Sequence, residues 1–181
     1  MNKTVAIIGA GQMGSGIAQT VAAHGMDVLL ADVSLDVAEQ AHKSIDKALG
    51  KLVGKGKLEI ADAEATLARI TPVGDYAPMK DASLIIEAAT EKEEIKQAIF
   101  GKAGEMLASD AIMASNTSSI PITRMANYAP DPARFIGLHF FNPVPVMKLI
   151  EVIPGLATAQ ATTDRTTAFA ESLGKEVVLS Q

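Results

Sequence analysis

The chain has 181 residues, a length that suits one α/β domain with its own hydrophobic core. Its formal net charge is −5 and it has no basic run, so a nucleic-acid-binding protein is not expected. It contains no cysteine, which excludes a disulfide scaffold, a thiolate metal site and a thiol nucleophile, and no metal site is predicted. Its apolar runs are strand-sized and no secretory signal precedes them, so we expect no membrane segment and a cytoplasmic location.

Short apolar strands and helices alternate along almost the whole chain. Strands are predicted over Thr4–Ile8, Asp27–Ala31, Arg69–Val73, Ala82–Glu87, Ala111–Ser115, Arg134–His139, Met147–Ile153 and Lys175–Leu179. Helices are predicted over Met13–His24, Leu35–Val53, Ala61–Ala68, Lys92–Leu107, Ile122–Tyr128 and Thr162–Leu173. This alternation is typical of a doubly wound, mainly parallel sheet with helices on both faces. The sequence therefore predicts an α/β fold of the Rossmann type.

A glycine-rich turn follows the first predicted strand. Gly9-Ala10-Gly11-Gln12-Met13-Gly14 is a G-x-G-x-x-G pattern, and it opens a helix. Gly9 permits the tight turn, Gly11 lets a pyrophosphate approach the backbone, and Gly14 allows close packing of helix and strand. Free N–H groups and the dipole at the helix start attract phosphates, so the pattern indicates a dinucleotide site.

Asp32 ends the second predicted strand, 18 residues after Gly14. A carboxylate at this place accepts hydrogen bonds from an adenosine ribose and repels a 2′-phosphate, so the sequence favours NAD over NADP. The alternative interpretation is a tight turn followed by a helix-capping aspartate.

His139 stands apart from the other two histidines because it ends a strand just before a proline-rich turn. If the chain reverses about Pro145, His139 and Glu151 are each six residues from the reversal, and the two side chains meet across a strand pair. Glu151 lies in an apolar run, where a lone charge would be costly. A histidine–carboxylate pair is a general acid/base device. The alternative is a capping histidine and an edge-strand glutamate.

Small polar residues follow another predicted strand, in the run Ser115-Asn116-Thr117-Ser118-Ser119. Side chains at the carboxyl end of a parallel strand face the ligand crevice in this architecture. The same residue types also favour ordinary helix caps and turns, so this alternative stays open.

Four motifs together carry a family resemblance. They are Gly9-Ala-Gly-Gln-Met-Gly-Ser-Gly-Ile-Ala, Ile86-Glu87-Ala88-Ala89, Ser115-Asn116-Thr117-Ser118-Ser119 and His139-Phe-Phe-Asn-Pro-Val-Pro-Val-Met-Lys-Leu-Ile-Glu151. With them the chain resembles, over essentially its whole length, the 3-hydroxyacyl-CoA dehydrogenase family in its short-chain 3-hydroxybutyryl-CoA form. The resemblance implies NAD-dependent interconversion of (S)-3-hydroxyacyl-CoA and 3-oxoacyl-CoA, with an acyl-CoA as the small-molecule substrate.

The resemblance also implies roles for individual residues. His139 is then the catalytic base, Glu151 its partner, Ser118 a contact of the reacting oxygen, and Asn142 part of the wall of the same site. Implied cofactor contacts are Gly9, Gly11, Gln12, Met13, Gly14, Asp32, Ala89, Glu91, Lys96 and Asn116, with Lys96 reaching the nicotinamide ribose.

The chain departs from the family in the segment Ala48–Lys57, which matches the segment that binds CoA. The family uses a serine and lysines there, but Gly50, Gly54 and Gly56 interrupt this segment and no serine matches. Lys51, Lys55 and Lys57 are candidate contacts of CoA, and Lys51 and Lys55 are the predicted substrate-binding residues. Three lysines near a helix end also fit a solvated face, so a dehydrogenase of a 3-hydroxy acid without CoA is the competing hypothesis.

The family continues beyond a stretch that resembles Gly174-Lys175-Glu176-Val177-Val178 into a helical domain. That domain completes the substrate pocket and makes the homodimer interface. Because this sequence stops at Gln181, we expect residues 1–181 to be the NAD-binding domain alone. A module that holds NAD without turnover in isolation is therefore a second alternative.

Overall fold

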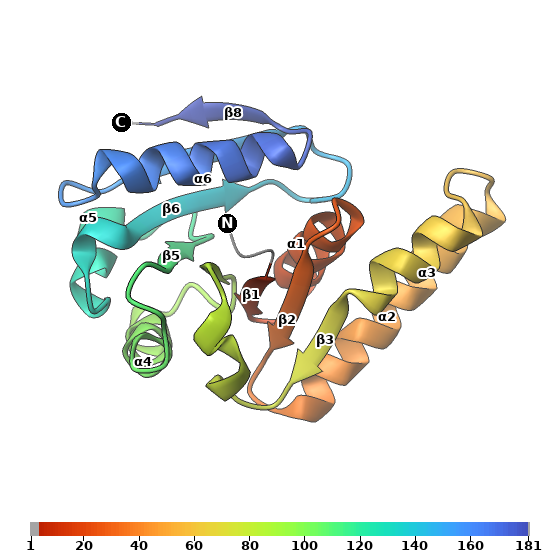
Figure 1. Ribbon diagram of the computed structural model, residues 1–181, viewed down its shortest axis with the longest axis horizontal. Helices are drawn as coiled ribbons and strands as arrows, with labels where there is room; N and C mark the ends of the chain where they lie inside the picture. Colours follow the sequence, from red (N-terminus) through yellow and green to blue (C-terminus); the bar gives the residue numbers. More distant parts are fainter. Residues whose placement is uncertain (1–3, 181) are drawn as a thin grey trace.

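The computed structural model describes residues 4–180, which form a sheet of eight strands with helices on both faces (Figure 1). The strands are β1 (Thr4–Ile8), β2 (Asp27–Ala31), β3 (Ile70–Val73), β4 (Leu84–Glu87), β5 (Ile112–Ser115), β6 (Phe135–Phe140), β7 (Leu149–Pro154) and β8 (Glu176–Leu179). Their spatial order is β3-β2-β1-β4-β5-β6-β7-β8. Residues 1–3 and 181 of the expected domain lie outside the described residues.

Strand direction follows from the connections. The first six strands in this spatial order, β3-β2-β1-β4-β5-β6, all run parallel to one another. Helices or long loops connect them, as parallel strands require. β7 runs antiparallel to β6 after a short turn, and β8 runs parallel to β7. The predicted fold class is confirmed. The carboxyl ends of the six parallel strands therefore lie at one edge, the edge where ligands bind in such sheets.

Helices cover the two faces in separate groups. They are α1 (Gln12–Ala23), α2 (Leu35–Gly54), α3 (Ile60–Ala68), α4 (Glu93–Gly104), α5 (Ile122–Met125) and α6 (Gln160–Ser172). Val5 and Ile7 of β1 pack into one core cluster with α1, α2 and α6, whereas Ala6 and Ile8 pack into another with α4 and α5. This is the period-two alternation of a strand buried on both sides.

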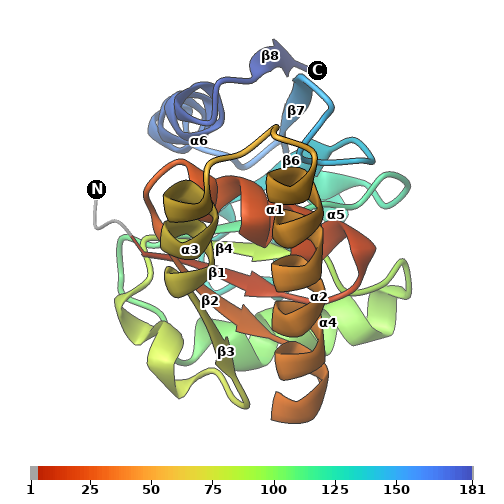
Figure 2. The same cartoon turned by 90° about the vertical axis from the view of Figure 1, so that its right-hand side faces the viewer.

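The α2–α3 hairpin projects from the sheet, and its two helices lie side by side (Figures 1 and 2). Ala38, Ala41, Ile45 and Leu49 form the buried stripe of α2 at helical spacing. The opposite face of α2 is polar and exposed.

The predicted elements agree with the observed ones to within a few residues, with two kinds of exception. The predicted helix Ile122–Tyr128 is the short α5 followed by a 3₁₀ turn at Ala126–Tyr128. Two further 3₁₀ turns, Ala77–Asp81 and Pro132–Arg134, were not predicted. Each begins beside an aspartate whose carboxylate accepts a backbone N–H two residues on, a local bond that favours turns.

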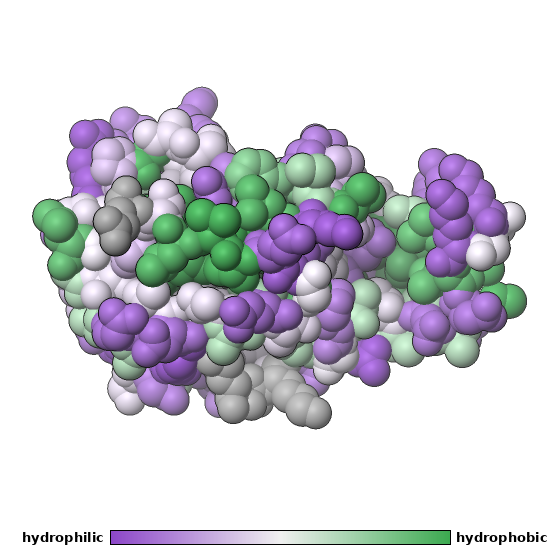
Figure 3. All heavy atoms as spheres, turned by 90° about the horizontal axis from the view of Figure 1, so that it is seen from above, coloured by the Kyte–Doolittle hydropathy of each residue, from purple (hydrophilic) through white to green (hydrophobic). Residues whose placement is uncertain are grey.

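The surface over β8 is apolar. Val178 and Leu179 are 48% and 52% exposed, and Figure 3 shows apolar side chains gathered above this edge strand. Within residues 4–180, no helix combines the length and apolar character that crossing a membrane requires.

Candidate active site

The turn from β1 into α1 is shaped by glycines that leave its backbone open. Gly9 has a φ of 105°, and a Cβ on it would lie 2.5 Å from the Cα of Ala89. A Cβ on Gly14 would overlap the carbonyl oxygen of Gly9, whereas a Cβ on Gly11 would meet nothing within 4 Å. Packing therefore requires Gly9 and Gly14, and Gly11 leaves the start of α1 accessible to a phosphate.

Asp32 lies beside this turn, at the carboxyl end of β2. Its Oδ2 accepts the N–H of Ala10 at 2.6 Å, and its Oδ1 accepts the N–H of Val33 at 2.7 Å. The residue that caps α2 is Ser34, whose Oγ accepts the N–H of Val37, so the helix-capping alternative for Asp32 is wrong. A carboxylate has about four acceptor sites, which leaves Asp32 able to accept ribose hydroxyls as well.

A pocket of about 190 Å³ opens where β4 and β5 end. Its lining comes from the start of α1, the segment after β4, α4 and the segment after β5. Five of the expected cofactor residues lie around it: Met13, Ala89, Glu91, Lys96 and Asn116. The Oδ1 of Asn116 also accepts the N–H of Phe140 at 2.8 Å, which joins this pocket to the end of β6.

A buried ion pair lies beneath this pocket. The Nζ of Lys96 is 2.6 Å from Oε2 of Glu87, and the two side chains are 1% and 0% exposed. Ser115 Oγ donates to the same Oε2, and Oε1 of Glu87 accepts the N–H of Ala89 at 2.8 Å. The ammonium of Lys96 is thus held by Glu87 and Ser115, and its reach to a nicotinamide ribose stays a prediction.

Glu91 is tied to the loop that carries Ser118. Its Oε2 accepts the hydroxyl of Thr117 at 2.7 Å and that of Ser119 at 2.6 Å. Ser118 lies between these two anchors, and its side chain is exposed. The structure therefore gives Glu91 a second task, beside the expected cofactor contact, in holding this loop.

His139 and Glu151 face each other across the β6–β7 pair. They are register partners, and the Nδ1 of His139 is 2.8 Å from Oε2 of Glu151. Both are partly exposed, at 19% and 32%, and the imidazole lies 4.6 Å from the ring of Phe141. The reversal about Pro145 is present, and it gives the imidazole a carboxylate partner instead of a cap.

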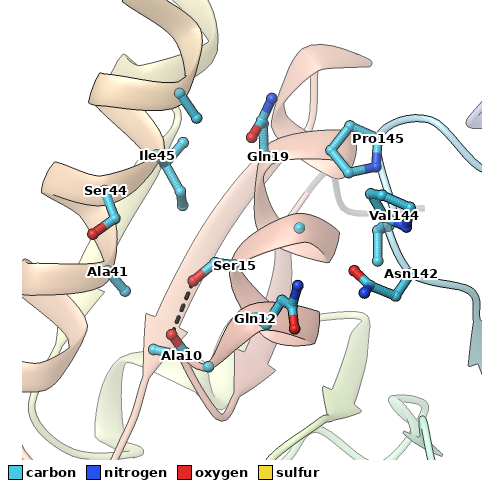
Figure 4. Close-up of a pocket in the computed structure, with 14 residues that line it drawn as sticks. Ala10, Gln12, Ser15, Gln19, Ala41, Ser44, Ile45, Asn142, Val144 and Pro145 are labelled. Carbon is cyan, nitrogen blue, oxygen red and sulfur yellow. Dashed lines mark hydrogen bonds between the residues drawn. The ribbon is translucent and has the colours of Figure 1, made fainter. Parts of the chain in front are cut away.

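A cavity of about 430 Å³ lies between α1, α2 and the turn after β6 (Figure 4). Gln12, Ser15 and Gln19 of α1 stand between Ser44 of α2 on one side and Asn142 on the other. The remaining lining residues are Ala10, Gly11, Gly16, Ala41, Ile45, Ala48, Pro143, Val144 and Pro145. The cavity therefore shares the cofactor-binding turn and reaches toward the strand pair that carries His139.

Residues 4–181 match the family described as 3-hydroxyacyl-CoA dehydrogenase, NAD binding domain. The chain belongs to this family. Its cofactor is therefore NAD. The geometry fits this cofactor, because Gly9 and Gly14 leave no room for side chains in the tight turn and the carboxylate of Asp32 lies at the carboxyl end of β2.

Curated relatives of this 3-hydroxyacyl-CoA dehydrogenase domain are longer than the chain. It is 44% identical to 3-hydroxyadipyl-CoA dehydrogenase of Escherichia coli, over 97% of this chain and 37% of the relative. It is 46% identical to a probable 3-hydroxybutyryl-CoA dehydrogenase of Deinococcus radiodurans, over 93% of this chain and 60% of the relative. The crystal structure of (S)-3-hydroxybutyryl-CoA dehydrogenase from Ralstonia eutropha matches with a TM-score of 0.96 and 41% identity, covering 99% of this chain and 63% of that one.

Lys51 and Lys55, the expected CoA contacts in this family domain, are exposed at the end of α2. Lys51 follows the cavity residue Ala48 by three positions and so lies on the same face of α2, and Lys55 is the residue that caps the end of this helix. Neither lines the cavity, and their contact with CoA stays a prediction.

Sequence reasoning missed several residues of this site. Glu87 is an acidic residue at the end of an apolar strand, a signal that it has a buried partner. Ser44 lies between Ala41 and Ala48 on one face of α2. This run of small residues at helical spacing could have predicted that the face lines a cavity. Ser15 and Gly16 stand in the glycine motif, but nothing in the sequence marked them or Gln19 as cavity lining, because this role comes from the packing of the β6–β7 turn onto α1.

The charge of Asp32 is expected to set the preference for NADH over NADPH. In Asp32→Asn the amide oxygen still accepts the Ala10 N–H, but the repulsion of a 2′-phosphate is gone. We expect the ratio of the NADPH and NADH dissociation constants to fall about tenfold or more, as for the loss of one charged interaction. Calorimetric titration measures both constants. The exposed Asp36→Asn carries the same charge change and should keep the ratio, and an unchanged ratio in Asp32→Asn would contradict the assignment.

Acidification is expected to weaken the Glu91 loop. Partial burial raises the pKa of Glu91, but the hydrogen bonds from Ser119 and Thr117 and the charge of Lys96 outweigh it and hold the pKa below its usual range. Glu91 therefore stabilises the fold above its unfolded-state pKa, near 4.3, and this contribution is lost as the pH falls through the lower folded-state pKa. Urea unfolding from neutral to acidic pH should show a smaller loss of unfolding free energy in Glu91→Gln than in the wild type. The exposed Glu94→Gln should behave as the wild type, and equal pH slopes in all three proteins would contradict the role of Glu91.

Proposed function

We propose that the chain is the NAD-binding and acid/base part of an oxidoreductase that interconverts (S)-3-hydroxyacyl-CoA and 3-oxoacyl-CoA. Its substrate is then 3-hydroxybutyryl-CoA, by analogy with relatives named for it, and acetoacetyl-CoA is the corresponding 3-oxo compound. The observation that carries the proposal is the His139–Glu151 pair at the carboxyl end of β6. It lies next to the 190 Å³ pocket lined by Lys96 and Asn116, which we call the nicotinamide-side pocket.

His139 moves the proton in this proposal. An ionised carboxylate only accepts hydrogen bonds, so Glu151 keeps the ring proton of neutral His139 on Nδ1 and leaves the lone pair on Nε2. In oxidation Nε2 takes the hydroxyl proton of the substrate, and in reduction it returns a proton to the carbonyl oxygen. Glu151 orients the ring and stabilises the imidazolium that forms. Bound NAD supplies the hydride acceptor, and NADH the donor.

Ser118 and Asn142 complete the polar surroundings of the reacting oxygen. The hydroxyl of Ser118 is exposed on a loop held by Glu91, which suits a donor that has to meet a ligand oxygen. Asn142 follows His139 by three residues and lines the 430 Å³ cavity. These positions support a shared task in orienting the substrate.

The 430 Å³ cavity is the proposed place of the acyl-CoA arm. It leads from the turn between β6 and β7 along α2 toward Lys51 and Lys55. The positive ammonium groups of these lysines complement the negative charge of the CoA phosphates. A homodimer formed through a C-terminal helical domain is a further proposal from the same family, as is a cytoplasmic location.

The test loads the chain with NADH, adds acetoacetyl-CoA, and follows the absorbance of the reduced nicotinamide, with the chain in excess over NADH. We expect saturable binding of acetoacetyl-CoA and slow oxidation of NADH, which free CoA inhibits in a salt-sensitive way. Oxidation that free CoA does not affect would favour a 3-hydroxy acid substrate without CoA. An NADH-loaded chain that neither binds acetoacetyl-CoA nor oxidises NADH would contradict the proposal and favour an NAD-binding module.

A further inference from the structure

The turn between β6 and β7 is the wall of the large cavity and also the link between His139 and Glu151. It contributes Asn142 and Val144 to the cavity, together with the two prolines beside them. Within the turn, the carbonyl oxygen of Pro143 accepts the N–H groups of Val146 and Met147 at 3.0 and 2.9 Å. These local bonds fold the turn but do not fix its distance from α1.

Contact with α1 sets one side of this turn. A Cβ on Gly16 would lie 3.0 Å from the Cβ of Val144 and 3.6 Å from Cδ of Pro145. The turn therefore packs directly on the backbone of α1, at the height where Ser15 and Gln19 line the cavity. A small outward shift of the turn would widen the cavity at this point (Figure 4).

Lys175 holds the turn through its backbone. Its Nζ donates to the carbonyl oxygen of Val144 at 2.8 Å and to that of Met147 at 2.6 Å. Within the described chain Lys175 makes no ion pair with a carboxylate, and its partial burial lowers its pKa. The ammonium thus joins the carbonyl oxygens of Val144 and Met147, which within the described chain accept no hydrogen bond from the N–H groups of the turn itself.

The end of α6 brings Lys175 to this place. The helix is followed by Gly174 at a φ of 64°, a left-handed residue that turns the chain off the helix. The next residues start β8, where the N–H of Glu176 donates to the carbonyl oxygen of Lys148 at 2.7 Å. The backbone of Lys175 is therefore held between the end of α6 and the start of β8, and its side chain reaches the β6–β7 turn from there.

We propose that Lys175 is a positioning residue that sets the width of the acyl-CoA cavity by tying the β6–β7 turn, which packs on α1, to the start of β8. This inference rests on the proposed function, because it takes the cavity as the substrate site. In the described chain Lys175 donates no hydrogen bond to the residues of the nicotinamide-side pocket, to Asp32 or to the glycine turn that the cavity shares with the cofactor site. Loss of the ammonium therefore weakens acyl-CoA binding and leaves NADH binding in place.

The test compares Lys175→Met, Lys175→Arg and the control Lys80→Met, an exposed lysine of the Ala77–Asp81 turn. The dissociation constant for NADH is measured by calorimetry on the chain without cofactor, and that for acetoacetyl-CoA on the NAD⁺-loaded chain, where no hydride donor is present. Lys175→Met should bind acetoacetyl-CoA about tenfold more weakly, as expected for the loss of charged hydrogen bonds, and NADH within about twofold of the wild type. Lys175→Arg keeps donors and should recover most of the affinity, and Lys80→Met should match the wild type.

Amide hydrogen exchange gives a second readout that does not depend on ligands. The N–H groups of Val146 and Met147 should exchange about tenfold faster in Lys175→Met than in the wild type, because the turn opens more often. A uniform loss of stability would instead speed exchange across the sheet and weaken both ligands, and that result would overturn the positioning role. If Lys175→Met does not fold, Lys175→Gln, which keeps a shorter donor, takes its place.

The outcomes separate the two proposals. Wild-type affinity for acetoacetyl-CoA in Lys175→Met, with unchanged exchange in the turn, would overturn the role of Lys175 and leave the proposed function intact. A wild-type chain that binds NADH but not acetoacetyl-CoA would overturn the proposed function, and the cavity role of Lys175 with it.

Discussion

Replacement of His139 by glutamine is expected to slow the oxidation of NADH by acetoacetyl-CoA about 10²–10⁴-fold, the usual contribution of one acid/base group. Glutamine keeps polar atoms near Glu151 but cannot take up and return a proton at the place of Nε2. Single-turnover absorbance measures the rate. NADH affinity should stay within about twofold, since His139 lines neither pocket.

Glu151→Gln tests the partner of His139, because it keeps the shape of the pair and removes its charge. The amide can present its NH₂ group to Nδ1, which favours the wrong tautomer, and the imidazolium loses its counter-charge. We expect a rate loss of about 10²-fold or more. If both variants turned over at the wild-type rate, His139 and Glu151 would not be the acid/base pair.

Removal of one partner of the buried Glu87–Lys96 ion pair is expected to destabilise the domain more than other single changes at this site. Glu87→Leu leaves the Lys96 ammonium buried without its carboxylate, and Lys96→Met does the converse. Each should lower the free energy of unfolding by about 3–5 kcal/mol, the usual cost of an uncompensated buried charge. Urea unfolding followed by circular dichroism measures it.

The double variant Glu87→Leu/Lys96→Met tests the physical reason. With both charges gone, no unpaired ion is left in the core, so the double variant should be more stable than either single one. Arg124→Ala breaks an ion pair with Glu93 in which the arginine is 60% exposed, and it should change stability little. Additive losses in the double variant would show that the pair does not act as a unit.

Most of the fold could be predicted because its strands carry a strong local signal. Apolar runs such as Leu84–Glu87, followed by helices of 3.6-residue periodicity, admit few arrangements other than a parallel sheet. The short turns at Ala77–Asp81 and Pro132–Arg134 were not predicted. Each is supported by a single hydrogen bond in which an aspartate carboxylate, of Asp75 or Asp131, accepts a backbone N–H. Local bonds of this kind leave no periodic pattern in the sequence.

The site could be predicted where its residues are close in the sequence. His139 and Glu151 are symmetric about one turn, so a reversal about Pro145 was enough to predict their meeting, although a capping histidine stayed open until the strand register was known. The contacts of Glu91 with the Ser118 loop and of Lys175 with the β6–β7 turn join segments 26 to 31 residues apart. Such contacts depend on how helices and loops pack around the sheet, which periodicity does not specify.

We predict that residues 4–180 hold an NAD site beside the His139–Glu151 pair. Calorimetric titration of the wild-type chain with NADH, and in parallel with NADPH, tests it most directly. We predict saturable one-site binding of NADH and at least about tenfold weaker binding of NADPH, because Asp32 repels the 2′-phosphate. A folded chain that binds no NADH, or that binds both cofactors equally, would contradict the account.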